Sequence, residues 1–232
     1  MPNDSYHARA VVFDFDGVIA DTEWLHCDTF CAVLAEEGIV LSDEDHTERF
    51  LGINDFAGFR KAFDEVGRSL PESDLRSLVE RKSSIYSARL DEIRPFPRLG
   101  ELVEALAGRC LLGIASGGRA TEIRAVLRRN GLDRHFPVVV SADDVPLSKP
   151  DPAPYLRAVE VLRARTPSGR LSPTDCVAIE DSILGVRSAK SAGLRCLAVT
   201  HTYPRERLRE ADLVIDSIAS ASPDLILARP DR

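Results

Sequence analysis

Short apolar runs rich in β-branched residues recur along the chain and alternate with segments of helical spacing. The runs that predict strands cover residues 10–14, 111–115, 138–141, 176–180, 195–199 and 213–215. The segments that predict helices cover residues 99–107, 120–130, 152–164, 183–192 and 205–210. Strands that alternate with helices indicate an α/β fold whose parallel sheet is covered by helices on both faces. Such sheets bind ligands at the carboxyl ends of their strands.

The stretch from Thr22 to Ile93 interrupts this alternation, because its apolar positions have helical spacing and form no strand pattern. It ends at the sequence RPFPRLG, whose two prolines suit a stiff connector. We therefore expect two domains. Residues 1–21 and 94–232 form the α/β core, and residues 22–93 form an inserted all-helical domain. A lid over the strand ends would be inserted at this point of the chain.

Composition and charge narrow the possible partners. The chain has 232 residues, of which 44% are hydrophobic and 29% charged, and its net charge is −7. An acidic protein is a poor partner for nucleic acid or an anionic membrane, although a local cationic pocket can still bind a small anion. The polar start MPNDSYHARA predicts no signal peptide, and no apolar run approaches the length of a membrane span. We expect a cytoplasmic protein, and a monomer because no broad apolar surface stripe is visible.

The five cysteines form no CxxC pair. Cys27 and Cys31 are four residues apart on a predicted helix and could hold a metal, but packing inside the helical domain is the reading that we favour. Cysteines without a disulfide pattern are typical of the reducing cytosol.

Acidic side chains follow two of the apolar strands. Asp14 and Asp16 end the first strand, and Gly17 allows a sharp exit of the chain. A plain turn would use the same residues. Glu180 and Asp181 end another all-apolar strand, where burial without a counter-charge would be costly. If these strands are neighbours, four carboxylates share one rim and need a cation, and hard oxygen ligands with an incomplete protein shell suit Mg²⁺.

Phosphate-binding groups follow two other strands. The sequence ASGG offers the Ser116 hydroxyl and Gly117, and a helix begins near Arg119. Exposed N–H groups at such a junction bind phosphate, although an ordinary helix cap would look the same. Lys149 precedes a proline and therefore lies in an extended or loop conformation, where it is either solvated or directed at the rim.

Together these groups predict a phosphoryl-transfer site. A metal and hydrogen-bond donors would surround the transferring charge. One carboxylate can act as the nucleophile, forming an aspartyl phosphate, and a second one two residues on can act as acid and base.

The sequence resembles the haloacid dehalogenase superfamily, in the branch of enzymes similar to β-phosphoglucomutase and phosphoglycolate phosphatase. The resemblance covers nearly the whole chain and rests on DFDGVIADTE, ASGG, SKPDP and IEDS in the family's order. It implies a Rossmann-like core, a helical cap at residues 22–93, Mg²⁺ as the cofactor and a small phosphorylated metabolite as the substrate.

The resemblance also implies roles for individual residues. Asp14 is expected to be the nucleophile and a metal ligand, and Asp16 the general acid/base that also gives its backbone carbonyl to the metal. Ser116 and Lys149 are expected to bind the phosphoryl group, and Glu180 and Asp181 to bind the metal. The substrate-binding positions implied are Gly17, Thr22, His26, Gly52, Lys82, Gly117 and Arg119.

Three functions stay open at this point. An acid at Asp16 fits a phosphatase or mutase, which must protonate an alcohol leaving group, and argues against dehalogenation. Within the cap, Thr22, His26 and Lys82 resemble β-phosphoglucomutase, but Asp55 stands where those mutases have an arginine that grips a second phosphate. An aspartate would repel that phosphate, which favours a phosphatase of a sugar-like monophosphate over a mutase. A catalytically silent regulatory protein is disfavoured because Asp14 and Lys149 are both present.

Overall fold

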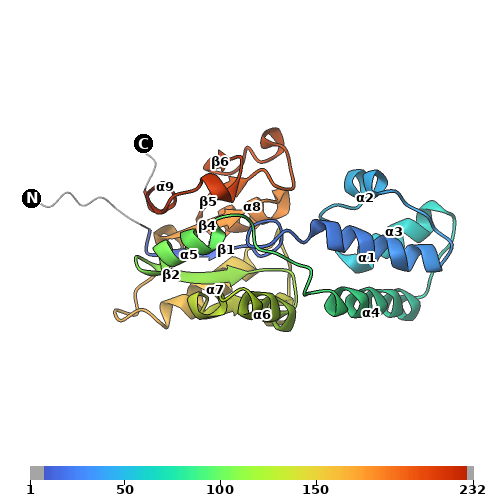
Figure 1. Cartoon of the computed structure of the whole chain (residues 1–232), viewed down its shortest axis with the longest axis horizontal. Helices are drawn as coiled ribbons and strands as arrows, with labels where there is room; N and C mark the ends of the chain where they lie inside the picture. Colours follow the sequence, from blue (N-terminus) through green and yellow to red (C-terminus); the bar gives the residue numbers. More distant parts are fainter. Residues whose placement is uncertain (1–7, 229–232) are drawn as a thin grey trace, which may run out of the picture. The chain divides into compact units, whose positions relative to one another are not determined.

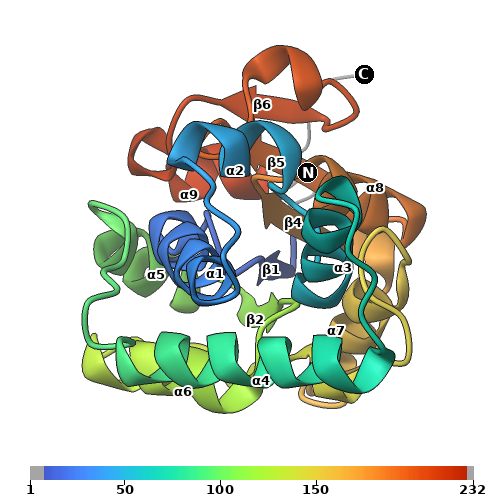
Figure 2. The ribbon, with the colours of Figure 1, turned by 90° about the vertical axis from the view of Figure 1, so that its right-hand side faces the viewer.

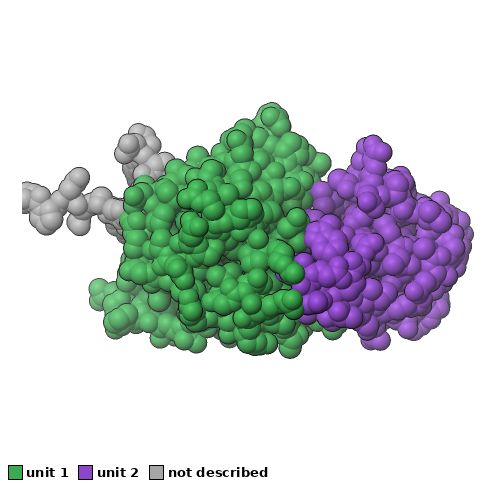
Figure 3. Space-filling model, in the orientation of Figure 1, with its two compact units in different colours: residues 1–21, 94–232 green, residues 22–93 purple. Residues whose placement is uncertain are grey.

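The structure, a computed structural model, describes residues 8–228. The chain divides into two compact units (Figure 3). Of the described residues, 8–21 and 94–228 form one unit, and Thr22–Ile93 form the other. No helix in the described part of the chain is long and apolar enough to cross a membrane. The expectation about a signal peptide falls largely on residues 1–7, outside the described residues.

A six-stranded sheet forms the centre of the first unit (Figure 1), and all of its strand pairs are parallel. The strands are β1 (Ala10–Phe13), β2 (Leu111–Ala115), β3 (Val138–Val140), β4 (Cys176–Glu180), β5 (Arg195–Val199) and β6 (Leu213–Ile215). Their order is β3-β2-β1-β4-β5-β6. The predicted parallel sheet is therefore confirmed, and β1 lies directly between β2 and β4.

Helices cover both faces of this sheet. They are α5 (Leu99–Ala107), α6 (Ala120–Arg129), α7 (Ala153–Arg163), α8 (Ile183–Ser191) and the short α9 (Pro223–Leu227). Helix α7 packs against β1, β2 and β3, and α8 packs against β4 and β5. Helix α5 packs against β2, and Figure 2 shows it on the opposite side of the sheet from α7 and α8. The α/β fold class is thus confirmed.

The apolar pattern of the strands follows from this double cover. All four residues of β1 are fully buried. On one face Ala10 and Val12 belong to the same core cluster as Tyr155 of α7. Phe13 meets Phe136 edge to face, with ring centroids 5.5 Å apart. A strand buried on both faces reads as a continuous apolar run instead of an alternating one.

Five short 3₁₀ helices complete the assigned helical turns of residues 8–228. They are η1 (Asp133–His135), η2 (Ala142–Asp144), η3 (Pro173–Asp175), η4 (Arg205–Arg207) and η5 (Ile218–Ser220).

The prediction of a helix over residues 205–210 was wrong, because only η4 forms there. The stretch contains one apolar residue, Leu208, which is 1% exposed and reaches the core after a single turn. Arg205 is engaged by Val214 and Asp216, whose oxygens accept its guanidinium hydrogens at 2.6 Å. Helix α9 was not predicted; its signal is Ser222, whose side chain caps the helix, followed by a proline at the first helical position.

The second unit contains four helices. They are α1 (Glu23–Glu36), α2 (Asp43–Arg49), α3 (Asp55–Glu65) and α4 (Glu72–Ala88). The absence of strands from Thr22–Ile93 agrees with the sequence pattern. Phe30 of α1 and Phe59 of α3 stack at 4.6 Å between ring centroids in the core of this unit. Asn54 caps α3 by accepting a hydrogen bond from the Ala57 backbone N–H, which helps to fix where the helix begins.

The two connections of the inserted unit run side by side within the first unit. Ala20 forms an antiparallel bridge with Pro95. The backbone N–H of Asp21 donates to the Arg94 carbonyl at 3.3 Å, and that of Phe96 donates to the Ile19 carbonyl at 3.1 Å. Phe96 is therefore held next to the loop that follows β1.

We expect Phe59→Ala to lower the free energy of unfolding of the inserted unit by about 3–5 kcal/mol, because the change removes a fully buried ring and leaves a cavity. Val66→Ala is the control: Val66 is 50% exposed just beyond α3, so its truncation should change that free energy by about 0.5 kcal/mol or less. Denaturant titration of both variants measures the difference. Equal stability of the two would contradict the packing described for this core.

Candidate active site

Asp14 lies where β1 leaves the sheet, and its backbone and side chain are both held. Its N–H donates to the Ile179 carbonyl at 2.9 Å, which extends the ladder between β1 and β4 by one residue. Its Oδ1 accepts a hydrogen bond from the Phe15 backbone N–H at 2.7 Å. The residue is 7% exposed. The strand thus presents a nearly buried carboxylate in a fixed orientation.

Lys149 links the ends of β1 and β4. Its Nζ lies 2.9 Å from Asp14 Oδ1 and 2.6 Å from Glu180 Oε1. The ammonium also lies 5.2 Å from the ring centroid of Tyr155, on α7. One cation therefore offsets the charge of two carboxylates that come from neighbouring strands.

Glu180 is fully buried and its carboxylate is enclosed by donors. Oε1 accepts from Lys149 and from the Tyr155 hydroxyl, the latter at 2.7 Å. Oε2 accepts from the backbone N–H groups of Asp181 and Ser182 and from the Ser182 hydroxyl, at 3.1–3.3 Å. A Cβ at Gly185 of α8 would lie 2.0 Å from this carboxylate, so the glycine makes room for it.

Carboxylate oxygens of Asp14, Glu180 and Asp181 lie within 4.8 Å of one another, and all three residues are buried. Between residues 8 and 228 this is the one group of three or more potential ligands with such spacing. Hard oxygen donors at this separation fit a divalent cation such as Mg²⁺. Asp16 does not add its carboxylate to this group.

Burial and the neighbouring charges shift the pKa values of Asp14 and Lys149. Burial raises the pKa of Asp14; Lys149 lowers it, and Glu180 and Asp16 raise it further, to about 8 in all. Burial lowers the pKa of Lys149, but Asp14 and Glu180 more than offset this and raise it above its usual value. Lys149 therefore stays protonated, while the metal-free protein holds Asp14 charged only at a cost.

Asp181 is fixed from a different strand. It is 3% exposed, and its Oδ2 accepts a hydrogen bond from the Thr202 hydroxyl, in the loop after β5. Gly17 packs against the same carboxylate, because a Cβ there would lie 1.8 Å from Asp181 Oδ2. The φ angle of Gly17 is 70°, a left-handed conformation that glycine adopts without strain.

The loop after β2 lies beside this cluster. Ser116 is 2% exposed; its hydroxyl donates to Asp16 Oδ2 at 3.4 Å and accepts from the Gly118 N–H at 2.9 Å. Gly117 and Arg119 are exposed. Arg119 is the N-cap of α6 and its side chain makes no capping hydrogen bond. The first N–H groups of α6 lack partners within the helix, as at any helix start, and such groups can bind an anion.

Four predicted binding residues belong to the inserted unit. Thr22 is the N-cap of α1 and is fully buried. His26 Nδ1 lies 3.0 Å from Lys82 Nζ, so these two predicted residues are brought together. Gly52 is exposed in the turn before α3. Lys82 is 3% exposed and also pairs with Asp55 at 2.5 Å, which balances its charge. Their participation in substrate binding stays a prediction.

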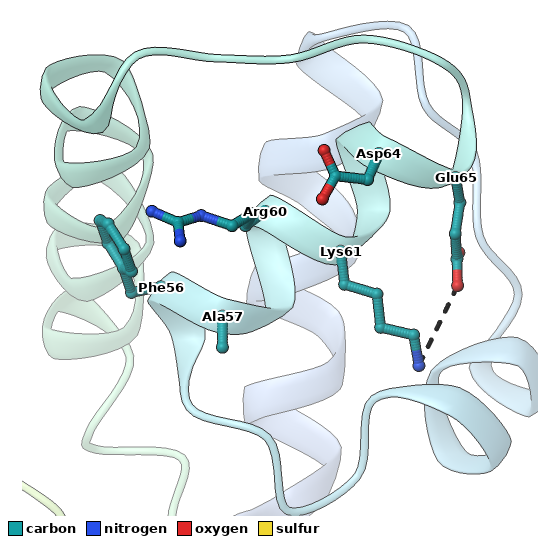
Figure 4. A pocket seen from close by; sticks show the side chains of 6 residues that line it. All are labelled: Phe56, Ala57, Arg60, Lys61, Asp64 and Glu65. Atoms are coloured by element: carbon teal, nitrogen blue, oxygen red, sulfur yellow. Dashed lines mark ion pairs between the residues drawn. The ribbon is translucent and has the colours of Figure 1, made fainter.

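Two other features of the inserted unit do not form a comparable site. Cys27 and Cys31 belong to no potential metal cluster of the described residues, and the Cys27 thiol donates to the Asp43 carboxylate at 3.7 Å. A hollow on the surface of α3 is lined by Phe56, Ala57, Arg60, Lys61, Asp64 and Glu65 (Figure 4). Its cations have acidic partners, since Lys61 lies 4.0 Å from Glu65 and Arg60 lies 3.7 Å from Glu72.

Sequence reasoning missed Tyr155, Thr202 and Gly185. Tyr155 is part of the apolar face of α7, which hides its hydroxyl. Thr202 lies in the polar loop that follows β5, so attention to the polar residues after every strand would have found it. Gly185 on α8 carries no signal beyond its position five residues after Glu180.

Comparison with known proteins finds a matching family model and similar proteins that agree with it. Residues 11–199 match the family model described as haloacid dehalogenase-like hydrolase. The phosphorylated carbohydrates phosphatase of Thermotoga maritima is 32% identical over 223 residues, covering 94% of this chain and 96% of that protein. The beta-phosphoglucomutase of Bacillus subtilis is 30% identical over 226 residues, covering 94% of this chain and 93% of that protein.

The fold is similar to that of a solved structure as well. CbbY from Rhodobacter sphaeroides, in complex with phosphate, superposes with a TM-score of 0.75 at 27% identity, covering 92% of this chain and 96% of that one. The family model spans most of the chain, and the relatives named above align along nearly all of it. The chain therefore belongs to the haloacid dehalogenase-like hydrolase family, and its relatives include a phosphatase and a phosphoglucomutase.

Proposed function

We propose that this protein is a Mg²⁺-dependent phosphatase that hydrolyses a small phosphorylated metabolite, of the sugar phosphate class, through an aspartyl phosphate on Asp14. One observation carries the proposal. The Asp14 carboxylate ends β1 with an ammonium 2.9 Å away and two further carboxylates beside it. A nucleophile, a cation that offsets its charge and a set of oxygen ligands for a metal are thus within one cluster.

The reaction proceeds in two steps. In the first, a carboxylate oxygen of Asp14 attacks phosphorus, the bond from phosphorus to the alcohol oxygen breaks, and the Asp16 carboxyl gives its proton to that oxygen. In the second, a water attacks phosphorus, Asp16 takes the proton of that water, and the bond between phosphorus and Asp14 breaks. Inorganic phosphate leaves, and both carboxyl groups return to their initial state.

The remaining residues hold the transferring group. The Ser116 hydroxyl and the Lys149 ammonium bind phosphoryl oxygens, and the N–H groups around Gly117 and the start of α6 add further donors. Asp14, Glu180 and Asp181, with the Asp16 backbone carbonyl, would hold Mg²⁺. When bound, the ion offsets the negative charge of the phosphoryl oxygens and of the carboxylates.

The substrate class rests on relatives and on one ion pair. The Thermotoga maritima relative is named as a phosphatase of phosphorylated carbohydrates. In the inserted unit the charge of Lys82 is already balanced by Asp55, 2.5 Å away, which leaves it poorly suited to a second phosphate. Both points favour a sugar monophosphate.

A sugar-phosphate mutase is the second candidate. The Bacillus subtilis beta-phosphoglucomutase is 30% identical over 226 residues. The 3.0 Å contact between His26 and Lys82 joins two residues on which the sequence resemblance to those mutases rests. In this case the phosphoryl group would pass from Asp14 to a second sugar hydroxyl instead of to water.

A panel of phosphate esters with Mg²⁺ distinguishes the two candidates. The panel contains β-glucose 1-phosphate with a trace of glucose 1,6-bisphosphate, glucose 6-phosphate, fructose 1-phosphate, phosphoglycolate and p-nitrophenyl phosphate. We expect release of inorganic phosphate from one or a few sugar phosphates. Formation of glucose 6-phosphate from β-glucose 1-phosphate with little free phosphate would establish the mutase instead.

We expect Asp14→Asn to abolish turnover, because the amide is a poor nucleophile and cannot form the acyl phosphate. The metal-free variant should remain folded, and at pH 8 it should melt at a higher temperature than the metal-free parent because one buried charge is gone. Phosphate release and thermal melts measure these effects, with Asp224→Asn as a control at an exposed carboxylate. Activity above a few per cent of the parent's would contradict the nucleophile assignment.

We expect turnover to stop in excess EDTA and to return with Mg²⁺, and Mg²⁺ to raise the melting temperature more at pH 8 than at pH 6. The pKa of Asp14 is raised to about 8 in the metal-free protein, above its unfolded value of 3.8. The folded protein therefore keeps a proton that the unfolded chain releases, and its stability falls as pH rises through this window. Mg²⁺ must displace that proton, so it binds better as pH rises.

Asp181→Asn serves as the control for this metal experiment, because it removes a carboxylate of the cluster and should reduce the Mg²⁺-induced rise in melting temperature at both pH values. Full turnover in EDTA would contradict the proposed metal requirement.

A further inference from the structure

The loop that follows β5 contacts the loop that follows β1, which carries Asp16 and is called the catalytic loop here. The proposed reaction does not explain this contact. His201 is half-buried in this loop, and its Nδ1 lies 2.8 Å from the carbonyl oxygen of Gly17. Gly17 directly follows Asp16, the proposed acid/base. The imidazole therefore contacts the residue next to the one that carries this carboxylate.

The other atoms of the His201 ring are also engaged. Nε2 lies 3.1 Å from the Ser217 hydroxyl and accepts a hydrogen bond from the Ile218 backbone N–H at 3.3 Å. The ring stacks on Phe96 of the second connector, with centroids 3.9 Å apart and planes inclined by 25°. Three segments distant in sequence thus fix the position of one imidazole.

These partners select a single protonation state. The Gly17 carbonyl can only accept a hydrogen bond, so Nδ1 must carry a proton. The Ile218 N–H can only donate, so Nε2 must be unprotonated. Burial lowers the pKa of His201, although the Gly17 carbonyl and Asp21 oppose this, and a neutral ring agrees with the hydrogen bonds.

The orientation of the Gly17 carbonyl affects the conformation of the catalytic loop. The Gly17 N–H donates to the Ala20 carbonyl at 2.9 Å, which closes the turn, and the residue adopts a left-handed φ of 70°. Rotation of the peptide that follows Gly17 would break the bond to His201 and move the backbone beside Asp16. Oδ2 of that carboxylate accepts a hydrogen bond from the Ser116 hydroxyl at 3.4 Å, so a shift of the backbone would also change this contact.

We propose that His201 is a positioning residue for the reaction: by donating from Nδ1 to the Gly17 carbonyl it fixes the turn that directs the Asp16 carboxyl at the leaving group. The role rests on the proposed function, because it requires Asp16 to act as the acid. His201 acts through another residue, because its hydrogen bonds run to Gly17, Ser217 and Ile218 and not to a proposed metal ligand. The neighbouring Thr202 hydroxyl donates to Asp181, so the same loop also orients one carboxylate of the acidic cluster.

The test compares His201→Phe with His201→Asn. Phenylalanine keeps the stacking on Phe96 but cannot donate to Gly17. Asparagine loses the ring, but its side-chain amide N–H can donate from a position close to that of Nδ1. His135→Phe, in η1, is the matched control for a histidine-to-phenylalanine change elsewhere in the same unit.

Two substrates separate positioning of the acid from a general loss of structure. p-Nitrophenyl phosphate has a leaving group that departs without a proton, whereas a sugar alcohol must be protonated as it leaves. For the sugar phosphate that the parent protein hydrolyses fastest in the panel above, we expect His201→Phe to lower kcat/KM by about 10- to 100-fold, because this constant reports the first step, in which the acid protonates the leaving group. With p-nitrophenyl phosphate, kcat/KM should fall less than about threefold, because it reports the first step, in which this leaving group needs little help from the acid. The second step, in which Asp16 acts as the base, is common to both substrates and affects only kcat.

His201→Asn should recover part of the kcat/KM lost with the sugar phosphate, and His135→Phe should behave like the parent. The Mg²⁺-induced rise in melting temperature should be the same in the parent and in both His201 variants. Hydrogen exchange of the peptide covering residues 15–20 should be faster in His201→Phe than in the parent and slower again in His201→Asn.

Equal losses of kcat/KM on both substrates would overturn the proposal, as would unchanged kcat/KM for the sugar phosphate in a folded His201→Phe protein or no recovery in His201→Asn. A parent protein that releases no phosphate from any ester would refute the proposed function, and the role of His201 with it. A parent that turns over normally while His201→Phe fails these expectations would refute only the positioning role.

Discussion

The ion pairs of Lys149 are the interaction on which the candidate site depends. Taking carboxylates out of water is costly, and three of them meet here below 10% exposure. Lys149 neutralises part of this charge because it contacts Asp14 and Glu180 at once. Neutral donors complete the shell of Glu180, so its carboxylate is satisfied before any ion or substrate arrives. Lys149 brings one positive charge to a cluster of three carboxylates, Asp14, Glu180 and Asp181, and a cation bound beside them would offset more of their negative charge.

The sheet order explains why residues from distant parts of the sequence meet. The chain first builds outward from β1 to β2 and β3, then crosses back and continues from β4 to β6 on the other side. The ends of β1 and β4 are therefore neighbours at the place where the direction of winding reverses, and α/β proteins commonly bind ligands there. Asp14 comes from one side of this reversal, and Glu180 and Asp181 from the other. The inserted unit begins after β1 has ended, so the insertion does not alter the sheet register.

The sequence was informative where burial and charge conflict. An apolar strand that ends in Asp14 or in Glu180 is conspicuous, because the pattern of a buried strand predicts no acid there. Lys149 was recognisable because the following proline excludes a helix. Tyr155 was not, because its ring satisfies the apolar pattern of α7 and its hydroxyl leaves no trace in that pattern. His201 stands in a loop whose threonines and proline look like an ordinary turn, and only tertiary structure shows that its ring spans three segments. The prediction of a helix over residues 205–210 was wrong for a related reason. A segment of six residues with one apolar position does not specify more than a turn.

The missing side chain at Gly185 has a consequence for how this sequence can vary. Helix α8 and the end of β4 come so close that any Cβ at this position would overlap the Glu180 carboxylate. The two positions therefore share one volume, and they can change only together: a larger residue on the helix requires a shorter or differently directed acid on the strand. Glu180 also accepts a hydrogen bond from Lys149. The residue at position 185 therefore limits, through Glu180, which positively charged side chain can lie beside Asp14.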